Sequence, residues 1–196
     1  MADTGTIERD TRHMAPDDDD IPSVEEITPL VPPELERYEI VDGAVVLTMV
    51  ATDAHQHVIT EFGYELVTWA RPREAVVRYQ PTDVRTTRTR QREPDILVVL
   101  AEHRDRIRPS GVLAGAPDLV VEVLSRSTRH VDLGAKRAEY AGIGVPEYVC
   151  VDPVTGLVRV FTPDSAEPRL VQRDETFTST VLDGFSVPLD RVLPPA

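Results

Sequence analysis

Two carboxylates stand where apolar β-strands are expected. Glu122 interrupts the run LVVEVL, and Asp95 opens the run DILVVL directly after a proline. An ionised carboxylate in a dry strand costs several kcal/mol unless a cation or metal compensates it. If the two strands are neighbours, about 4.8 Å apart, Asp95 and Glu122 can meet. Two carboxylates, completed by water and a phosphate oxygen, suit Mg²⁺ or Mn²⁺.

Lys136 is the sole lysine of the chain, beside 20 arginines. An ammonium is a compact point charge whose pKa moves on desolvation, whereas a guanidinium keeps its proton. Lys136 lies on the segment after the Glu122 strand, which would bring it toward the two carboxylates. An Asp, a Glu and a Lys around one metal ion are typical of phosphodiester hydrolysis. The alternative is a surface ion pair with Asp132, worth about 0.3–0.5 kcal/mol.

The elements that must position these residues follow from hydrophobic periodicity and turn signals. The Asp42-Gly43 pair predicts a β-hairpin, and Asp53, with Gln56 in a capping box, predicts the start of a helix that ends at Pro72. Further strands are expected within 75–87 (with a turn at Pro81), 94–100, 117–124, 146–153, 155–161 and 169–190, and a second helix from about 128 to 142 or 144. A helix between the 117–124 and 146–153 strands is a crossover between neighbours. The order predicts an α/β (α+β) fold, a mixed sheet flanked by helices, with an N-terminal β-hairpin and C-terminal β-strands.

Charge is spread unevenly along the 196 residues. The net charge is −13, and residues 1–28 hold nine acids against two bases. We expect residues 1–28 to be an acidic disordered tail and 29–196 to be a single domain. Four consecutive aspartates, residues 17–20, could compete with nucleic acid for arginines elsewhere; the alternative is an extension that only aids solubility. The single cysteine, Cys150, fits a reducing compartment.

An arginine-rich segment leads directly into Asp95. Such a local basic patch beside carboxylates is suited to a phosphate backbone, whatever the net charge. The alternative is a solvated hairpin whose arginines balance acids elsewhere. The residues expected to contact nucleic acid are Arg85, Arg88, Arg90, Arg92, Arg126 and Arg129.

Other polar residues near these segments have two readings each. His55, near the start of the first long helix, could contact a phosphate or a metal-bound water, or be a helix-start histidine. Tyr140 is expected mainly to pack the helix of Lys136. Ser125 and Thr128 are expected to shape the turn before that helix, since no activating base is obvious. Asp118 is expected to cap a turn at the strand mouth.

Several stretches together resemble one known family. YEIVDGAVVL, HQHVITEF, EPDILVVL and GAPDLVVEVLSRSTRHVDLGAKRAEYAGIGVPEYVCVDP look like the Uma-two family, which is described as putative restriction endonucleases with the PD-(D/E)XK nuclease fold. The resemblance covers about residues 33–193 and implies metal ligands at Asp95 and Glu122. The nuclease signature would put lysine at position 124, where this chain has leucine. The resemblance therefore implies Lys136, on the following helix, as the catalytic lysine, and it matches His55 to the family's histidine.

These observations favour a metal-dependent endonuclease, acting with Mg²⁺ or Mn²⁺ on DNA. Two alternatives stay open: a catalytically inactive nuclease-fold module that binds nucleic acid or protein, and a two-carboxylate glycosidase, which an aromatic content of 5% disfavours. No apolar run is long enough for a membrane helix, and no signal peptide is visible. We expect a cytoplasmic protein, a homodimer, with no membrane partner.

Overall fold

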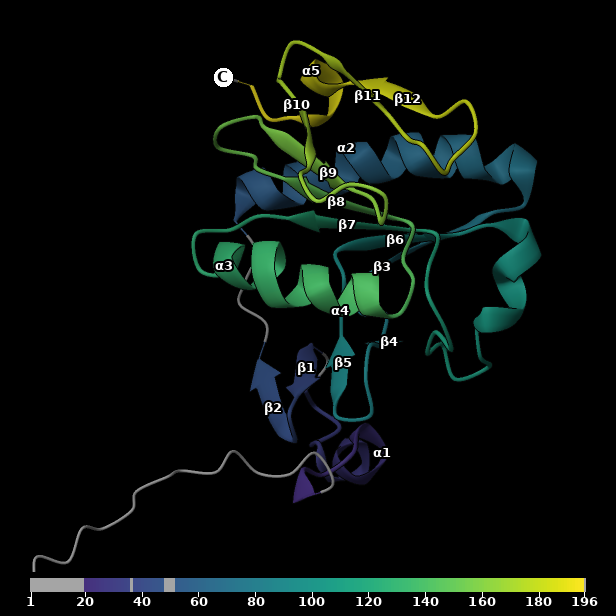
Figure 1. Ribbon diagram of the computed structural model, residues 1–196, viewed down its shortest axis with the longest axis vertical. Coiled ribbons are helices and arrows are strands. Elements are labelled where there is room, and N and C mark those ends of the chain that lie inside the picture. The colour runs from purple at the N-terminus through teal and green to yellow at the C-terminus, as the bar shows by residue number, and fades with distance from the viewer. Residues whose placement is uncertain (1–19, 36, 48–51, 196) are drawn as a thin grey trace, which may run out of the picture.

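A mixed six-stranded sheet lies at the centre of the computed structural model, which describes residues 20–35, 37–47 and 52–195 (Figure 1). Its strand order is β10-β9-β8-β7-β6-β3. Only β7 and β8 pair in parallel, and every other pair is antiparallel. The predicted mixed sheet is confirmed. Its strands are β3 (Val76–Tyr79), β6 (Ile96–Val99), β7 (Leu119–Val123), β8 (Glu147–Val151), β9 (Val158–Phe161) and β10 (Arg169–Val171).

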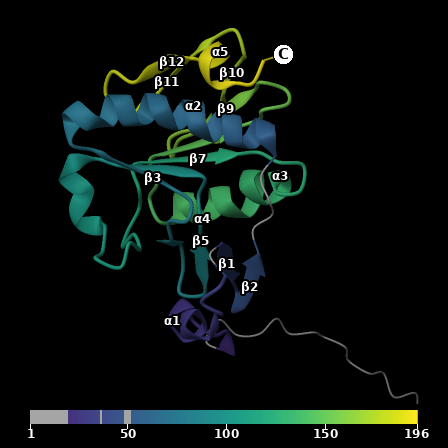
Figure 2. The ribbon, with the colours of Figure 1, turned by 180° about the vertical axis from the view of Figure 1, so that it is seen from behind.

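Helical layers cover both faces of this sheet. Helix α2 (Asp53–Ala70) and the C-terminal segment lie on one face, and the helical stretch 129–142 lies on the other (Figures 1 and 2). Residues of β6 and β7 are fully buried and alternate between two apolar clusters, one against each layer. A strand buried on both faces reads as a continuous apolar run, which explains why both strands could be recognised in the sequence.

The capping residue of the long helix α2 (Asp53–Ala70) is Thr52, one residue before the predicted cap Asp53. Thr52 is the N-cap, and its hydroxyl accepts a hydrogen bond from the His55 backbone N–H at 3.3 Å. Asp53 is the first helical residue, where a carboxylate still favours the positive end of the helix dipole. Apolar side chains at helical spacing, Phe62 among them, face the sheet. The helix ends before η3 (Arg71–Arg73), which contains the predicted breaker Pro72.

The helical stretch between β7 and β8 is the predicted crossover and is not uniform. It consists of α3 (Arg129–Val131), a π-helical turn η5 (Asp132–Lys136) and α4 (Arg137–Gly142). π-helical turns inside helices are rare and occur often at functional sites. The π-helical turn ends at Lys136, so the irregular backbone includes the lysine that the sequence predicts to be catalytic.

A second sheet, of four strands, lies beyond α4 (Figure 1). The predicted hairpin is present, with Asp42 and Gly43 both at positive φ, +48° and +76°, as a tight two-residue turn requires. The arginine-rich segment forms the other pair of strands, and β5 pairs with β1. The order is β2-β1-β5-β4. The strands are β1 (Tyr38–Val41), β2 (Ala44–Leu47), β4 (Val84–Arg85) and β5 (Arg90–Arg92).

The end of the predicted acidic tail is folded. Ser23 and Glu26 form a reciprocal capping box for α1 (Val24–Ile27), which leads into η2 (Thr28–Leu30). Val24 is buried, and its N–H donates to the Arg88 carbonyl at 2.9 Å. The expectation of disorder up to residue 28 is therefore wrong for residues 20–28. That expectation rested on the acidic composition and gave too little weight to the Ser-x-x-Glu capping box, which stabilises the first turn of α1. The rest of the predicted tail, residues 1–19, lies outside the described residues.

Short elements complete the chain. Segment η4 (Ala101–Arg106) follows β6, and the C-terminal part forms β11 (Thr176–Thr178), β12 (Ser186–Pro188) and α5 (Leu189–Val192). These C-terminal elements pack over α2. Across the described part of the chain, none of the helices has the length and apolar content needed to span a bilayer.

Candidate active site

Asp95 and Glu122 face each other across neighbouring strands. The antiparallel register pairs Ile96 with Val121, so the next position along places Asp95 opposite Glu122. The Asp95 carboxylate accepts a hydrogen bond from the Val123 backbone N–H at 2.7 Å. Both carboxylates are buried, with residue exposures of 4% and 2%. The sequence predicted that the two carboxylates meet only if their strands are neighbours, and β6 and β7 are neighbours in the sheet.

Lys136 lies in the same place, surrounded by carboxylates. Its Nζ is 3.1 Å from Glu122 Oε1, 3.0 Å from Glu39 Oε1 and 3.3 Å from Asp132 Oδ1. The ion pair with Asp132, proposed above as the alternative role, is thus present together with the Glu122 contact. It is buried, however, and not the surface pair that was considered. The Lys136 ammonium donates a hydrogen bond to Glu122, and its contacts with Glu39 and Asp132 are ion pairs.

Glu39 is a site residue that the sequence reasoning missed. Its carboxylate contacts both Lys136 and Arg92, the latter at 2.8 Å between Oε2 and Nη1. It comes from β1, more than 80 residues before the helix of Lys136, and reaches it because β1 pairs with β5. An isolated carboxylate in a β-rich run was the available signal, the same one that drew attention to Glu122.

His55 joins the site from the start of α2. Its Nε2 lies 3.1 Å from Asp95 Oδ2, and its ring is buried, with Nδ1 lacking a partner among the described residues. The histidine therefore contacts a candidate metal ligand directly. This geometry suits a residue that orients the Asp95 carboxylate.

Burial and like charges set the protonation of this cluster. Burial, followed by the charges of Asp95, Asp132 and Glu39, raises the pKa of Glu122 well above its usual value, and Lys136 opposes the rise. Burial lowers the pKa of Lys136, but Glu122 and the other carboxylates outweigh it, so the pKa is raised and the ammonium keeps its proton. The cluster holds more acids than cations, so an added divalent cation would be favoured there.

One cavity of about 400 Å³ collects these groups. It is lined by His55, Asp95, Glu122, Asp132 and Lys136, and by the loop that follows β7. In that loop the Ser125 and Thr128 hydroxyls lie 2.9 Å apart and the Thr128 N–H donates to Ser125, as expected for residues that shape a turn. All four residues predicted to be catalytic therefore line a single cavity.

Two other predicted roles follow local packing. The Asp118 carboxylate accepts a hydrogen bond from the Leu100 N–H at 2.7 Å and lies 2.6 Å from His103 Nδ1, which confirms its capping role. Tyr140 is fully buried, with its ring 5.3 Å from that of Tyr148, and its hydroxyl lies 3.5 Å from Glu122. Tyr140 therefore packs the helix against the sheet and contacts the site from behind.

The arginines expected to contact nucleic acid do not form one open basic surface. Arg92 is 3% exposed and bonded to Glu139 and Glu39, so it belongs to the buried ion-pair network. Arg90 contacts Asp42 at 2.7 Å and Glu139 at 3.0 Å. These pairs match the alternative of arginines balanced by acids.

The other four arginines are placed differently. Arg85 is paired with Glu25, and Arg129 is paired with Asp152. Arg88 accepts the Val24 N–H at its backbone carbonyl. Arg126 is exposed and lines the cavity of the catalytic residues, which makes it the arginine of this set that lies at the site.

The donor set fits a hard divalent cation held by few protein ligands. Within the ranges that the structure describes, no three or more His, Cys, Asp or Glu residues are arranged to hold a metal ion. Asp95 and Glu122 face each other and are the two carboxylates that could hold such an ion, with water and substrate oxygens at the remaining positions. Mg²⁺ is commonly bound in this way, through one or two carboxylates and phosphate oxygens.

Comparison with known proteins identifies the family of the chain. The model of the Uma2 family, described as "putative restriction endonuclease", matches residues 24–190. The chain belongs to the Uma2 family. The resemblance noted in the sequence is thereby confirmed, and the family and fold indicate a restriction-endonuclease-like nuclease.

A solved structure has the same fold as this Uma2 protein. It is the crystal structure of a putative nuclease belonging to DUF820 from Anabaena variabilis, 18% identical, with a TM-score of 0.74. The match covers 87% of this chain and 96% of the other. No curated protein matches the sequence. The likeness confirms the predicted restriction-endonuclease-like fold class.

Proposed function

We propose that this protein is a metal-dependent endonuclease that hydrolyses phosphodiester bonds, with DNA as substrate. The observation that carries the proposal is the convergence of Asp95, Glu122 and Lys136 in one cavity. Asp95 directly precedes β6, Glu122 lies in β7, and Lys136 lies in the crossover helix. Each was selected from the sequence for its chemistry.

The chain's residues would divide the work as follows. Asp95 and Glu122 would hold Mg²⁺ or Mn²⁺, which supplies an acidified water and charge neutralisation. Lys136 adds a fixed positive charge beside Glu122, where phosphate charge develops. His55 orients Asp95 through their 3.1 Å contact. Arg126, exposed at the cavity, would contact a backbone phosphate.

Nucleic-acid contacts by the other arginines remain predictions. Arg85, Arg88, Arg90 and Arg129 would have to exchange or share their present partners with phosphates. The burial of Arg92 favours a structural role for it. Arg126 is therefore the first arginine to test, and Arg126→Ala should weaken DNA binding and reduce its salt dependence.

Glu122→Gln tests the hydrolysis directly. The change keeps the side-chain shape and removes the charge, so metal-dependent cleavage of plasmid DNA should be lost and Mn²⁺ affinity should fall. Asp118→Asn is the matched control, because it neutralises a buried carboxylate beside the same strand, outside the cavity. Wild-type cleavage by Glu122→Gln would refute the assignment. Metal binding with no cleavage by the wild type would favour the alternative, an inactive nuclease-fold binding module.

We also propose a homodimer and a cytoplasmic location. Strand β2 lies at the edge of the four-stranded sheet and exposes Val45, Val46 and Leu47. An exposed apolar edge strand can pair with the same strand of a second copy about a two-fold axis. Light scattering measures the oligomeric state of the wild type and of Val46→Lys, which should weaken the pairing of the two β2 strands. A monomeric wild type would exclude the homodimer.

A further inference from the structure

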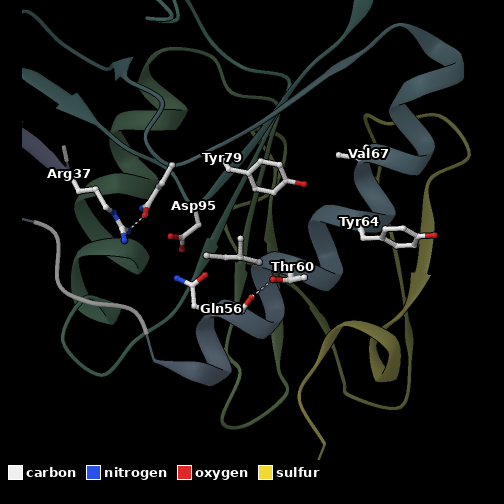
Figure 3. A pocket seen from close by; sticks show the side chains of 9 residues that line it. Arg37, Gln56, Thr60, Tyr64, Val67, Tyr79 and Asp95 are labelled. Atoms are coloured by element: carbon white, nitrogen blue, oxygen red, sulfur yellow. Dashed lines mark hydrogen bonds between the residues drawn. The ribbon is translucent and has the colours of Figure 1, made fainter.

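A second cavity adjoins the candidate active site, between α2 and the edge strand β3 (Figure 3). Its volume is about 530 Å³. It shares Arg37, Gln80 and Asp95 with the cavity of the catalytic residues. A molecule with its reacting group beside Asp95 could therefore extend into this second cavity.

The lining combines a flat aromatic wall with amide groups. Tyr79 and Ile59 supply apolar surface, and Gln56 and Gln80 supply amides. The Gln80 amide is fixed: its oxygen accepts from Arg37, and its nitrogen donates to the Glu93 carbonyl at 3.0 Å. Gln56 lies on an exposed position of α2 and, in Figure 3, at the same end of the cavity as Asp95. An aromatic face beside the exposed amide of Gln56 suits a flat ligand with a hydrogen-bonding edge.

The position of Tyr79 depends on a glycine. A Cβ on Gly63 of α2 would lie 2.5 Å from both Cε1 and Oη of Tyr79. Real Cβ atoms essentially never come so close, so any larger residue at this helix position would displace the ring. Glycine in a helix interior costs up to about 1 kcal/mol relative to alanine, and here it allows Tyr79 to form the cavity wall.

We propose that this cavity binds an unpaired nucleobase of the substrate, stacked on Tyr79, next to the phosphate at the catalytic cavity. The inference rests on the proposed function and names its substrate class: single-stranded or locally unpaired nucleic acid. A base inside a duplex is stacked and paired, so neither its face nor its Watson–Crick edge is available to Tyr79 or Gln56. Arg37, which lines both cavities, lies where the chain would pass between the base and the phosphate.

The experiment measures binding without cleavage. A fluorescein-labelled dT12 and an abasic oligonucleotide of equal length are titrated by anisotropy in EDTA at low salt. Base–aromatic stacking is worth roughly 5- to 150-fold in Kd per base. The wild type should prefer dT12 over the abasic strand by a factor in that range. Tyr79→Ala should bind both alike, and Tyr79→Phe should keep the preference.

A glycine pair supplies a second, independent test. Gly63→Ala keeps Tyr79 but moves its ring, so it should abolish the preference for dT12. Gly142→Ala is the matched control, because no atom lies within 4 Å of the added Cβ. Circular dichroism verifies that each variant folds. Equal binding of both strands by the wild type, no binding of either, or an undiminished preference in Tyr79→Ala or Gly63→Ala would overturn the proposal.

The outcome separates this proposal from that of hydrolysis. Anisotropy in EDTA requires neither metal nor turnover. A base preference that depends on Tyr79, in a protein that cleaves nothing, would support the base site and refute the nuclease assignment. Cleavage that depends on Glu122, without any base preference, would do the reverse.

Discussion

Replacing Lys136 by methionine should destabilise the protein strongly. The ammonium is the central cation of a buried cluster, with contacts of 3.0–3.3 Å to three carboxylates. Methionine has a similar length and no charge, so it would leave those acids without their shared partner. Removing one member of a buried ion pair costs about 3–5 kcal/mol. For a domain of this size the melting temperature should fall by roughly 6–20 °C at pH 8.

The loss should depend on pH in a defined direction. The pKa of Glu122 in the fold is raised above its unfolded value, mainly by burial, and loss of Lys136 would raise it further. A carboxyl with a raised pKa destabilises the fold as pH rises through that pKa, because ionisation is less costly in the unfolded chain. Lys136→Met should therefore lose more stability at pH 8 than at pH 5.5, because the raised pKa of Glu122 leaves a larger fraction of this carboxyl protonated at the lower pH.

Thermal denaturation followed by circular dichroism at both pH values measures the effect. Arg104→Met is the control, since it removes an exposed cation. Adding Glu122→Gln to Lys136→Met should recover part of the loss at pH 8. A melting temperature of Lys136→Met within 2 °C of wild type at pH 8 (roughly below 1 kcal/mol), or a loss independent of pH, would refute this account of the cluster.

Three further outcomes are expected. Lys136→Arg should fold but lose about 10²-fold or more in cleavage rate, because a planar fork cannot place its donors as the ammonium does; a wild-type rate would leave Lys136 as an ion-pair residue only. Burial raises the pKa of Glu93 to about 7, so the free energy of unfolding measured in urea titrations should fall between pH 5 and 8, on the order of 2 kcal/mol after allowing for solvent screening. Glu93→Gln should flatten this pH profile. An already flat profile of the wild type would contradict the prediction. Deleting residues 1–19 should tighten DNA binding at low salt, with a gain that shrinks as salt rises, if the aspartates compete for arginines; equal affinity would exclude such competition. The deletion stops before Val24, because that residue is buried.

The sequence by itself determined the features that rest on local chemistry and short-range order. Asp42-Gly43 specified a hairpin because both positions tolerate positive φ. The apolar runs around Asp95 and Glu122 specified buried strands, and one β-helix-β segment specified the parallel pair β7–β8. Given that architecture, Asp95, Glu122 and Lys136 could be assigned to one place, and all three line the same cavity.

Only the tertiary structure decided which charges meet across long sequence separations. Glu39 reaches Lys136, and Glu139 reaches Arg92, through the pairing of β1 with β5 and the docking of α4. Sequence patterns report periodicity within an element but not which elements pack together. An arginine that could bind a phosphate therefore cannot be told from the sequence apart from one that is ion-paired with a carboxylate of the same chain. The cavity beside Tyr79 was invisible for the same reason, since it requires Gly63 of α2 to lie against the end of β3.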